Sequence, residues 1–183
     1  MKPYKLYQSD LIINNHQSII QACDIAQKYF EAKYNTSDST WRFMDYNIFN
    51  LTSSSLLFWK LFKELNYHIR SYIGDDRPLW LQAWLNYHSY SELESKLGYH
   101  HHDSPYHGYI SIDPQDTTTI FEGEWEITNR IGQIYIGPSG KDNKEYYHRV
   151  ENNSFYKNKR ITIGFNIQDI QDTVLNISHL PLL

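Results

Sequence analysis

The stretch Arg160-Ile161-Thr162-Ile163-Gly164-Phe165-Asn166-Ile167 alternates polar or small residues with large apolar ones. Side chains of a β-strand point to opposite faces in turn, so the alternation predicts a strand with one apolar and one polar face. The same pattern recurs at 79–86, 109–113 and 133–136, and turn residues such as Gly137-Pro138-Ser139-Gly140 separate these segments. Short strands divided by turns predict a jelly roll, whose inward face can line a binding cavity.

The first part of the chain has a helical pattern instead. Apolar residues recur at helical spacing over 16–34 and over 54–73, with a loop expected at 35–39. Ser53 to Ser55 supply an N-cap for the second helix, and Gly74 supplies its end. We therefore expect a mostly β protein in which N-terminal helices support a double-stranded β-helix (jelly-roll) core.

The chain length sets the domain organisation. At 183 residues, one domain with a sizeable core is expected. Residues 1–78 would form a helical support region, 79–170 the jelly-roll catalytic core and 171–183 a C-terminal tail.

Composition argues against several classes of protein. The chain is 40% hydrophobic and 21% charged, which is typical of a folded globular protein. A net charge of -4 argues against a nucleic-acid partner, because nucleic-acid surfaces are basic. The single cysteine, Cys23, allows no internal disulfide, and the chain has neither a membrane-length apolar run nor an apolar signal core. We therefore expect a cytoplasmic protein with no membrane association.

Metal-binding side chains are concentrated in His100-His101-His102-Asp103. Imidazole and carboxylate groups hold non-heme Fe(II), with two or three of them on one face of the metal. Residues i and i+2 of a strand point the same way, so either His100 with His102 or His101 with Asp103 can chelate one ion. His148 would be the third ligand in both cases. The residues alone favour His101 and Asp103, because two histidines and a carboxylate are the commonest Fe(II) set.

Arg160 is the candidate for binding an organic acid beside the metal. A guanidinium keeps its charge and can hold a carboxylate through two parallel hydrogen bonds. We expect segments 148–150 and 159–167 to form neighbouring strands joined by a polar loop, which would bring Arg160 close to His148. Thr162 faces the same way as Arg160 and can donate one more hydrogen bond.

Over a little under half of its length, the chain resembles a branch of the 2-oxoglutarate/Fe(II)-dependent oxygenases known largely from bacteria and their phages. The resemblance rests on six short motifs, which are here Trp84-Leu85-Asn86, His100-His101-His102, Gly108-Tyr109-Ile110, Gly132-Gln133-Ile134-Tyr135-Ile136-Gly137-Pro138, His148-Arg149-Val150 and Arg160-Ile161-Thr162-Ile163-Gly164-Phe165. The H-x-H motif of this branch falls on His100 and His102. The resemblance therefore favours that pair, while His101 and Asp103 stay an alternative.

The resemblance implies Fe(II) as the metal, 2-oxoglutarate as co-substrate and dioxygen as oxidant. The reaction would hydroxylate a peptide, an amino acid or a small metabolite, in a phage-encoded or bacterial protein. Arg160 and Thr162 would hold the distal carboxylate of 2-oxoglutarate, and Asn86, Tyr109 and Tyr135 would add contacts to it.

Two other functions fit the same residues. A cupin-like metal dioxygenase that does not use 2-oxoglutarate would suit three imidazole ligands, and a non-catalytic jelly-roll binding module would suit the strand pattern. The oxygenase differs from both in needing His148 and Arg160 together as catalytic residues. The mouth of the site is expected in loops 89–98 and 140–147, because loops carry specificity. His107 lies outside both ligand pairs, and we expect it to have a structural role.

Overall fold

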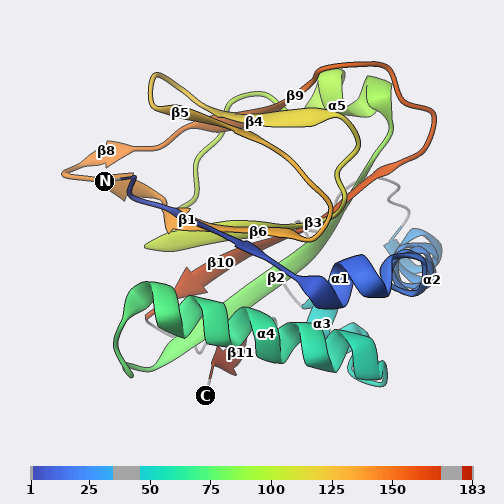
Figure 1. Ribbon diagram of the computed structural model, residues 1–183, viewed down its shortest axis with the longest axis horizontal. Helices are drawn as coiled ribbons and strands as arrows, with labels where there is room; N and C mark the ends of the chain where they lie inside the picture. The colour runs from blue at the N-terminus through green and yellow to red at the C-terminus, as the bar shows by residue number, and fades with distance from the viewer. Residues whose placement is uncertain (1, 35–45, 170–178, 183) are drawn as a thin grey trace.

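Two antiparallel sheets face each other, and helices cover the outer side of the larger sheet (Figure 1). The computed structural model describes residues 2–34, 46–169 and 179–182. The larger sheet has six strands in the order β1-β6-β3-β10-β2-β11, and the smaller has three in the order β5-β4-β9. The mostly β class and the jelly-roll core predicted from the strand alternation are confirmed.

The elements have the following bounds. The larger sheet contains β1 (Lys5–Gln8), β6 (Gln133–Pro138), β3 (Tyr106–Asp113), β10 (Arg160–Gln168), β2 (Leu79–His88) and β11 (His179–Leu182). The smaller sheet contains β5 (Trp125–Thr128), β4 (Thr117–Phe121) and β9 (His148–Asn152), and a short hairpin is formed by β7 (Gly140–Lys141) and β8 (Lys144–Glu145). The helices are α1 (Asp10–Asn14), α2 (His16–Tyr34), α3 (Ile48–Leu51), α4 (Leu56–Ile73) and α5 (Tyr90–Lys96).

Helix α4 forms where the apolar stripe predicts it. The Ser55 hydroxyl caps its start by accepting a hydrogen bond from the Phe58 amide at 3.4 Å. Gly74 ends it in the left-handed conformation, with φ of 78°, which glycine adopts without strain. The buried stripes of α2 and α4 pack on the apolar face of the larger sheet. The resulting core includes Ile19, Cys23, Phe30, Leu61, Leu65, Ile69, Leu81, Leu85, Ile110, Ile136, Ile163 and Ile167.

The inner face of the larger sheet carries the other half of the alternation. On β10 this face presents Arg160, Thr162 and Asn166, while the intervening isoleucines and Phe165 belong to the outer core. A second, largely aromatic cluster joins the two sheets. Its buried members are Tyr4, Tyr109, Phe121, Ile127, Tyr135 and Tyr146.

The expected pairing of segments 148–150 and 159–167 is wrong. Strand β9 pairs with β4 in the smaller sheet, whereas β10 lies between β3 and β2 in the larger sheet. The chain therefore crosses from one sheet to the other between β9 and β10. Alternation in a sequence reports which face of a strand is buried, but it does not name the partner strand.

The mouth region also differs from the sequence prediction. The expected loop 89–98 contains α5, which begins with a capping box: the Ser89 hydroxyl accepts from the Glu92 amide, and the Glu92 carboxylate accepts from the Ser89 amide. The expected loop 140–147 contains the β7–β8 hairpin.

Both edge strands of the larger sheet were missed by the sequence prediction. Strand β1 pairs with β6 at one edge, and β11 pairs with β2 at the other. Of the predicted tail 171–183, residues 179–182 form β11, while the other tail residues and the loop predicted at 35–39 lie outside the described residues. The predicted subdivision of the domain stays a prediction. Among the described residues, no helix combines the length and apolar character needed to cross a membrane.

Candidate metal centre

Three histidines from distant parts of the chain meet where the two sheets approach each other. His100, His102 and His148 each offer one imidazole nitrogen, and these nitrogens all lie within 4.8 Å of one another. We call these residues the histidine triad. His148 is the first residue of β9 and forms an isolated antiparallel bridge with His100. The bridge places two of the three imidazoles through the backbone itself.

Hydrogen bonds orient two of the three rings. His102 Nδ1 lies 2.7 Å from Asn166 Oδ1, and the Asn166 amide donates to Gln82 Oε1 at 3.2 Å. Because Asn166 Oδ1 accepts, His102 Nδ1 is the donor and His102 Nε2 keeps its lone pair. His100 Nδ1 lies 3.0 Å from the carbonyl oxygen of Gly98, which can only accept. Both rings therefore keep Nε2 available for a metal.

Burial keeps the inner imidazoles neutral. It lowers the pKa of His102 to about 4, an effect that His100 strengthens and the hydrogen bond to Asn166 opposes. Burial is also the largest cause for His148, whose pKa lies well below the ordinary value, and the nearby His100 and His102 lower it further. The neutral imidazole is the form that binds metal, so these rings need not lose a proton near neutral pH.

The alternative pair, His101 and Asp103, lies outside this group. The Asp103 side chain is fully exposed, and His101 lies 3.8 Å from Asp103 and 3.6 Å from Glu145. The His101 ring packs against Tyr147, with 5.0 Å between the ring centroids. Within the described part of the chain, the histidine triad is the group of His, Cys, Asp or Glu side chains that could hold a metal.

Arg160 is a buried cation, and no carboxylate pairs with it among the described residues. It is 4% exposed; its Nη1 donates to Thr162 Oγ1 at 3.4 Å, and its Nε has no hydrogen-bond partner. Burial lowers the pKa of Arg160 to about 10, while Tyr109 and Tyr156 raise it, so the group stays charged near neutral pH. A buried charge without a counter-ion is strongly unfavourable, so this position is a candidate binding site for an anion.

The remaining predicted contact residues are grouped around Arg160. Thr162 Oγ1 also accepts from Asn86 Nδ2 at 3.4 Å, across the β10–β2 pair. Tyr109 stacks on Tyr135 with 5.2 Å between ring centroids, and burial raises the pKa of both hydroxyls, which therefore stay protonated. These residues therefore lie together on the inner face of the larger sheet, and their role in 2-oxoglutarate binding stays a prediction.

Two features of this site were missed by the sequence analysis. Asn166, which orients His102, lies four residues beyond Thr162 on the same face of β10, so the period of two could have identified it. Gly164 lies between them, and a Cβ there would come within 2.8 Å of the Trp84 indole. The glycine leaves room for that ring, whose centroid is 6.0 Å from the centroid of His102.

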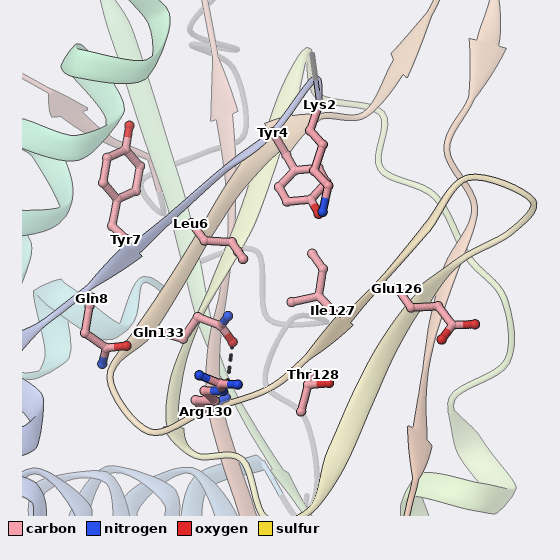
Figure 2. A pocket seen from close by; sticks show the side chains of 10 residues that line it. All are labelled: Lys2, Tyr4, Leu6, Tyr7, Gln8, Glu126, Ile127, Thr128, Arg130 and Gln133. Carbon is pink, nitrogen blue, oxygen red and sulfur yellow. Dashed lines mark hydrogen bonds between the residues drawn. The ribbon is translucent and has the colours of Figure 1, made fainter.

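A separate cavity of about 400 Å³ opens between β1 and β5 (Figure 2). Its lining includes Lys2, Tyr4, Glu126 and Arg130, and Gln133 accepts a hydrogen bond from the Arg130 amide at 3.1 Å. Among its lining residues Glu126 is the only acid, and none is a histidine or a cysteine. This donor set does not suit a metal, so the cavity is distinct from the candidate centre.

Comparison with known proteins gives structural matches only. No protein-family model and no curated protein sequence matches the chain. The viral collagen prolyl hydroxylase of Paramecium bursaria Chlorella virus 1, in a truncated form, is similar with a TM-score of 0.53 and 12% identity, over 92% of this chain and 91% of that chain. Its 2OG complex is similar with a TM-score of 0.52 and 12% identity, over 93% of this chain and 97% of that one. At such identity the likeness establishes a shared fold.

Proposed function

We propose that this chain is an Fe(II)- and 2-oxoglutarate-dependent oxygenase that hydroxylates a peptide, an amino acid or a small metabolite. One observation carries the proposal: the buried, unpaired Arg160 cation lies on the same face of β10 as Asn166, which orients a histidine of the triad. A buried cation and a residue that orients the imidazole set, both on one face of β10, suit a metal together with an organic acid that extends to the guanidinium.

The residues present fit the metal. His100, His102 and His148 would hold Fe(II) as three neutral imidazoles, and other positions would remain for the co-substrate and dioxygen. Fe(II) bound there would supply the activation of dioxygen. The protein orients the ligating rings through Asn166 and the Gly98 carbonyl.

The residues around Arg160 fit 2-oxoglutarate. The guanidinium would take the distal carboxylate of the di-acid in a two-pronged hydrogen-bonded pair, and Thr162 would add a hydroxyl contact. Asn86 holds Thr162 in place, and Tyr109 and Tyr135 would form the wall beside the bound carbon chain. The 2OG complex of a prolyl hydroxylase with a similar fold supports this choice of co-substrate.

The overall reaction balances with these components. A substrate C–H bond, 2-oxoglutarate and dioxygen would give a C–OH group, succinate and carbon dioxide. One oxygen atom enters the hydroxyl group and the other enters succinate. The aromatic cluster between the sheets, including Phe121 and Tyr135, would keep water away from the reacting atoms.

A second candidate is a cupin-like metal dioxygenase that does not use 2-oxoglutarate. The all-histidine triad favours it, because the commoner Fe(II) set includes a carboxylate. It leaves the buried charge of Arg160 without a function, which is why we rank it second.

The test is anaerobic titration of the full chain with Fe(II) and then with 2-oxoglutarate, monitored for a visible metal-to-ligand charge-transfer band. We expect the wild type to give the band. Arg160→Ala should weaken 2-oxoglutarate binding by about 100-fold or more while it keeps the metal, because a buried charge pair loses one partner. Lys157→Ala removes an exposed cation three residues away and should change neither affinity.

The outcomes separate the candidate functions. Metal binding without any effect of 2-oxoglutarate would favour the cupin-like dioxygenase, and absence of metal binding would favour a non-catalytic binding module. Succinate formation that depends on both Fe(II) and 2-oxoglutarate would support the oxygenase. Arg160→Lys keeps the charge but loses the planar fork, so we expect it to bind 2-oxoglutarate with intermediate affinity.

A further inference from the structure

A fourth imidazole lies against the histidine triad. His107, on β3, is 2% exposed, and its ring centroid is 4.4 Å from that of His102 and 5.0 Å from that of His148. The ring planes are within 7° and 9° of parallel, respectively. On its other sides His107 meets the rings of Phe121 and Tyr135, at centroid distances of 6.1 and 5.6 Å. The sequence analysis expected a structural role for this residue, but its hydrogen bonding points elsewhere.

One nitrogen of His107 has a partner and the other has none. Nδ1 lies 3.2 Å from Ser139 Oγ, while Nε2 is buried without a hydrogen-bond partner. Ser139 is itself buried, and among the described residues His107 Nδ1 is the acceptor within reach of its hydroxyl proton. A buried hydroxyl donates its proton, so Nδ1 accepts and the ring proton of the neutral imidazole sits on Nε2.

In this tautomer His107 cannot serve as a metal ligand as the triad histidines can. An Nε2 that carries the ring proton has no lone pair to offer a metal, so it can act only as a hydrogen-bond donor. Its surroundings are two triad imidazoles and two aromatic rings, and none of these is a hydrogen-bond partner for it. Among the described residues no acceptor is available to it, and a ligand bound beside the triad would supply one.

We infer that His107 is a positioning residue whose Nε2–H donates a hydrogen bond to a carboxylate or keto oxygen of the 2-oxo acid bound beside the histidine triad. The inference rests on the proposed function, and it deepens it by assigning a contact at the metal end of the co-substrate, opposite Arg160. Ser139 acts through His107, because its hydroxyl fixes the tautomer that donates.

The test measures metal affinity and 2-oxoglutarate affinity separately, under anaerobic conditions with the full chain. Co(II) absorption reports the metal, and the Fe(II) charge-transfer band reports the co-substrate and its energy. His107→Leu should leave the metal dissociation constant within about twofold, raise the 2-oxoglutarate dissociation constant about tenfold or more, and shift the band. His107→Gln keeps a donor near the position of Nε2 and should recover most of the affinity.

Two further variants keep the result interpretable. Ser139→Ala leaves the His107 ring in place but removes the hydroxyl that fixes its tautomer. It should weaken 2-oxoglutarate binding by a smaller factor than His107→Leu does, without loss of metal. His16→Leu removes an imidazole on α2 that contacts the Ile112 carbonyl at 2.8 Å, and it should change neither affinity.

Each result decides the inference. A folded His107→Leu with unchanged 2-oxoglutarate affinity and an unshifted band overturns it while the proposed function stands. An equal loss of metal in that variant overturns it too, since His107 would then be a ligand or a packing residue. If His107→Leu does not fold, an unchanged 2-oxoglutarate affinity in Ser139→Ala overturns it. A wild type without any 2-oxoglutarate-dependent band overturns the proposed function, and the inference falls with it.

Discussion

His100 and His148 are joined by two main-chain hydrogen bonds. The His100 amide donates to the His148 carbonyl at 3.0 Å, and the His148 amide donates to the His100 carbonyl at 2.9 Å. This bridge ties the segment ahead of β3 to the first residue of β9. Two imidazoles of the triad are therefore held in place by paired main-chain hydrogen bonds, which gives the site a rigid base.

The triad assignment leads to a first prediction. Removing any one ring, as in His100→Ala, His102→Ala or His148→Ala, should lower the affinity for Fe(II) or Co(II) by about 100-fold or more, because ligand changes exceed the effects of outer groups. Competition with a coloured chelator measures this change. His101→Ala and Asp103→Asn are the matched controls, and both should keep near wild-type affinity. A larger loss in these controls than in the triad variants would reverse the assignment.

Asn166 provides a second prediction. Asn166→Leu removes the acceptor of His102 Nδ1, so His102 is free to rotate and to change tautomer. We expect metal affinity to fall about 10- to 100-fold, which is the usual effect of a lost partner to a ligating histidine. Gln82→Ala leaves Asn166 Oδ1 in place and should have a smaller effect in the same chelator assay. Equal effects of the two variants would mean that Asn166 matters only for packing.

The contact between α5 and the start of β10 gives a prediction about pH. Burial alone would raise the pKa of Glu92, but hydrogen bonds from Lys159 and Ser89 and the charge of Lys159 outweigh it and lower the pKa to about 2. The Glu92 carboxylate lies 2.8 Å from Lys159 Nζ, next to Arg160 in the chain. The folded pKa is below the unfolded value of 4.5, so this stabilisation is complete above about pH 4.5 and is lost as the pH falls toward about 2.

Urea unfolding across this range checks the prediction. Glu92→Gln should lower the free energy of unfolding by about 1 kcal/mol near pH 7, the scale of a helix cap with a partly exposed ion pair. The difference from wild type should shrink as the pH falls from 4.5 toward 2. Glu126→Gln, at an exposed position on β5, is the control. A difference that stays constant with pH would show that the ionised carboxylate is not the stabilising group.

Gly108 allows no side chain at the centre of β3. A Cβ there would overlap the carbonyl oxygen of Tyr135 on one neighbour and the ring of Phe165 on the other. Gly108→Ala should therefore destabilise the protein by about 1–3 kcal/mol, as measured by thermal or urea unfolding. Gly98→Ala, where a Cβ would meet nothing within 4 Å, should stay within about 0.5 kcal/mol of wild type. Similar stabilities for the two variants would contradict the close packing of β3.

The sequence by itself determined the long helices, the central strands of the larger sheet and the residue types of the candidate site. Helix α4 and strands β2 and β10 could be predicted from the spacing of apolar residues within each segment. That spacing shows which face of the helix or strand is buried, and it needs no knowledge of the neighbouring elements. The histidine cluster and Arg160 were identified from their chemistry, since no other common side chains offer imidazole nitrogens or a permanent cation.

Only the tertiary structure decided how these parts meet. The segment from His100 to Asp103 is a single bridge residue followed by irregular chain, so the strand rule that residues i and i+2 share a face had no basis there. Which histidines converge depends instead on the bridge between His100 and His148. The tertiary structure also decided that β9 and β10 lie in different sheets and that His107 lies against the triad. Contacts between distant segments depend on how strands pair and sheets stack. The alternation of residues within one segment does not specify either.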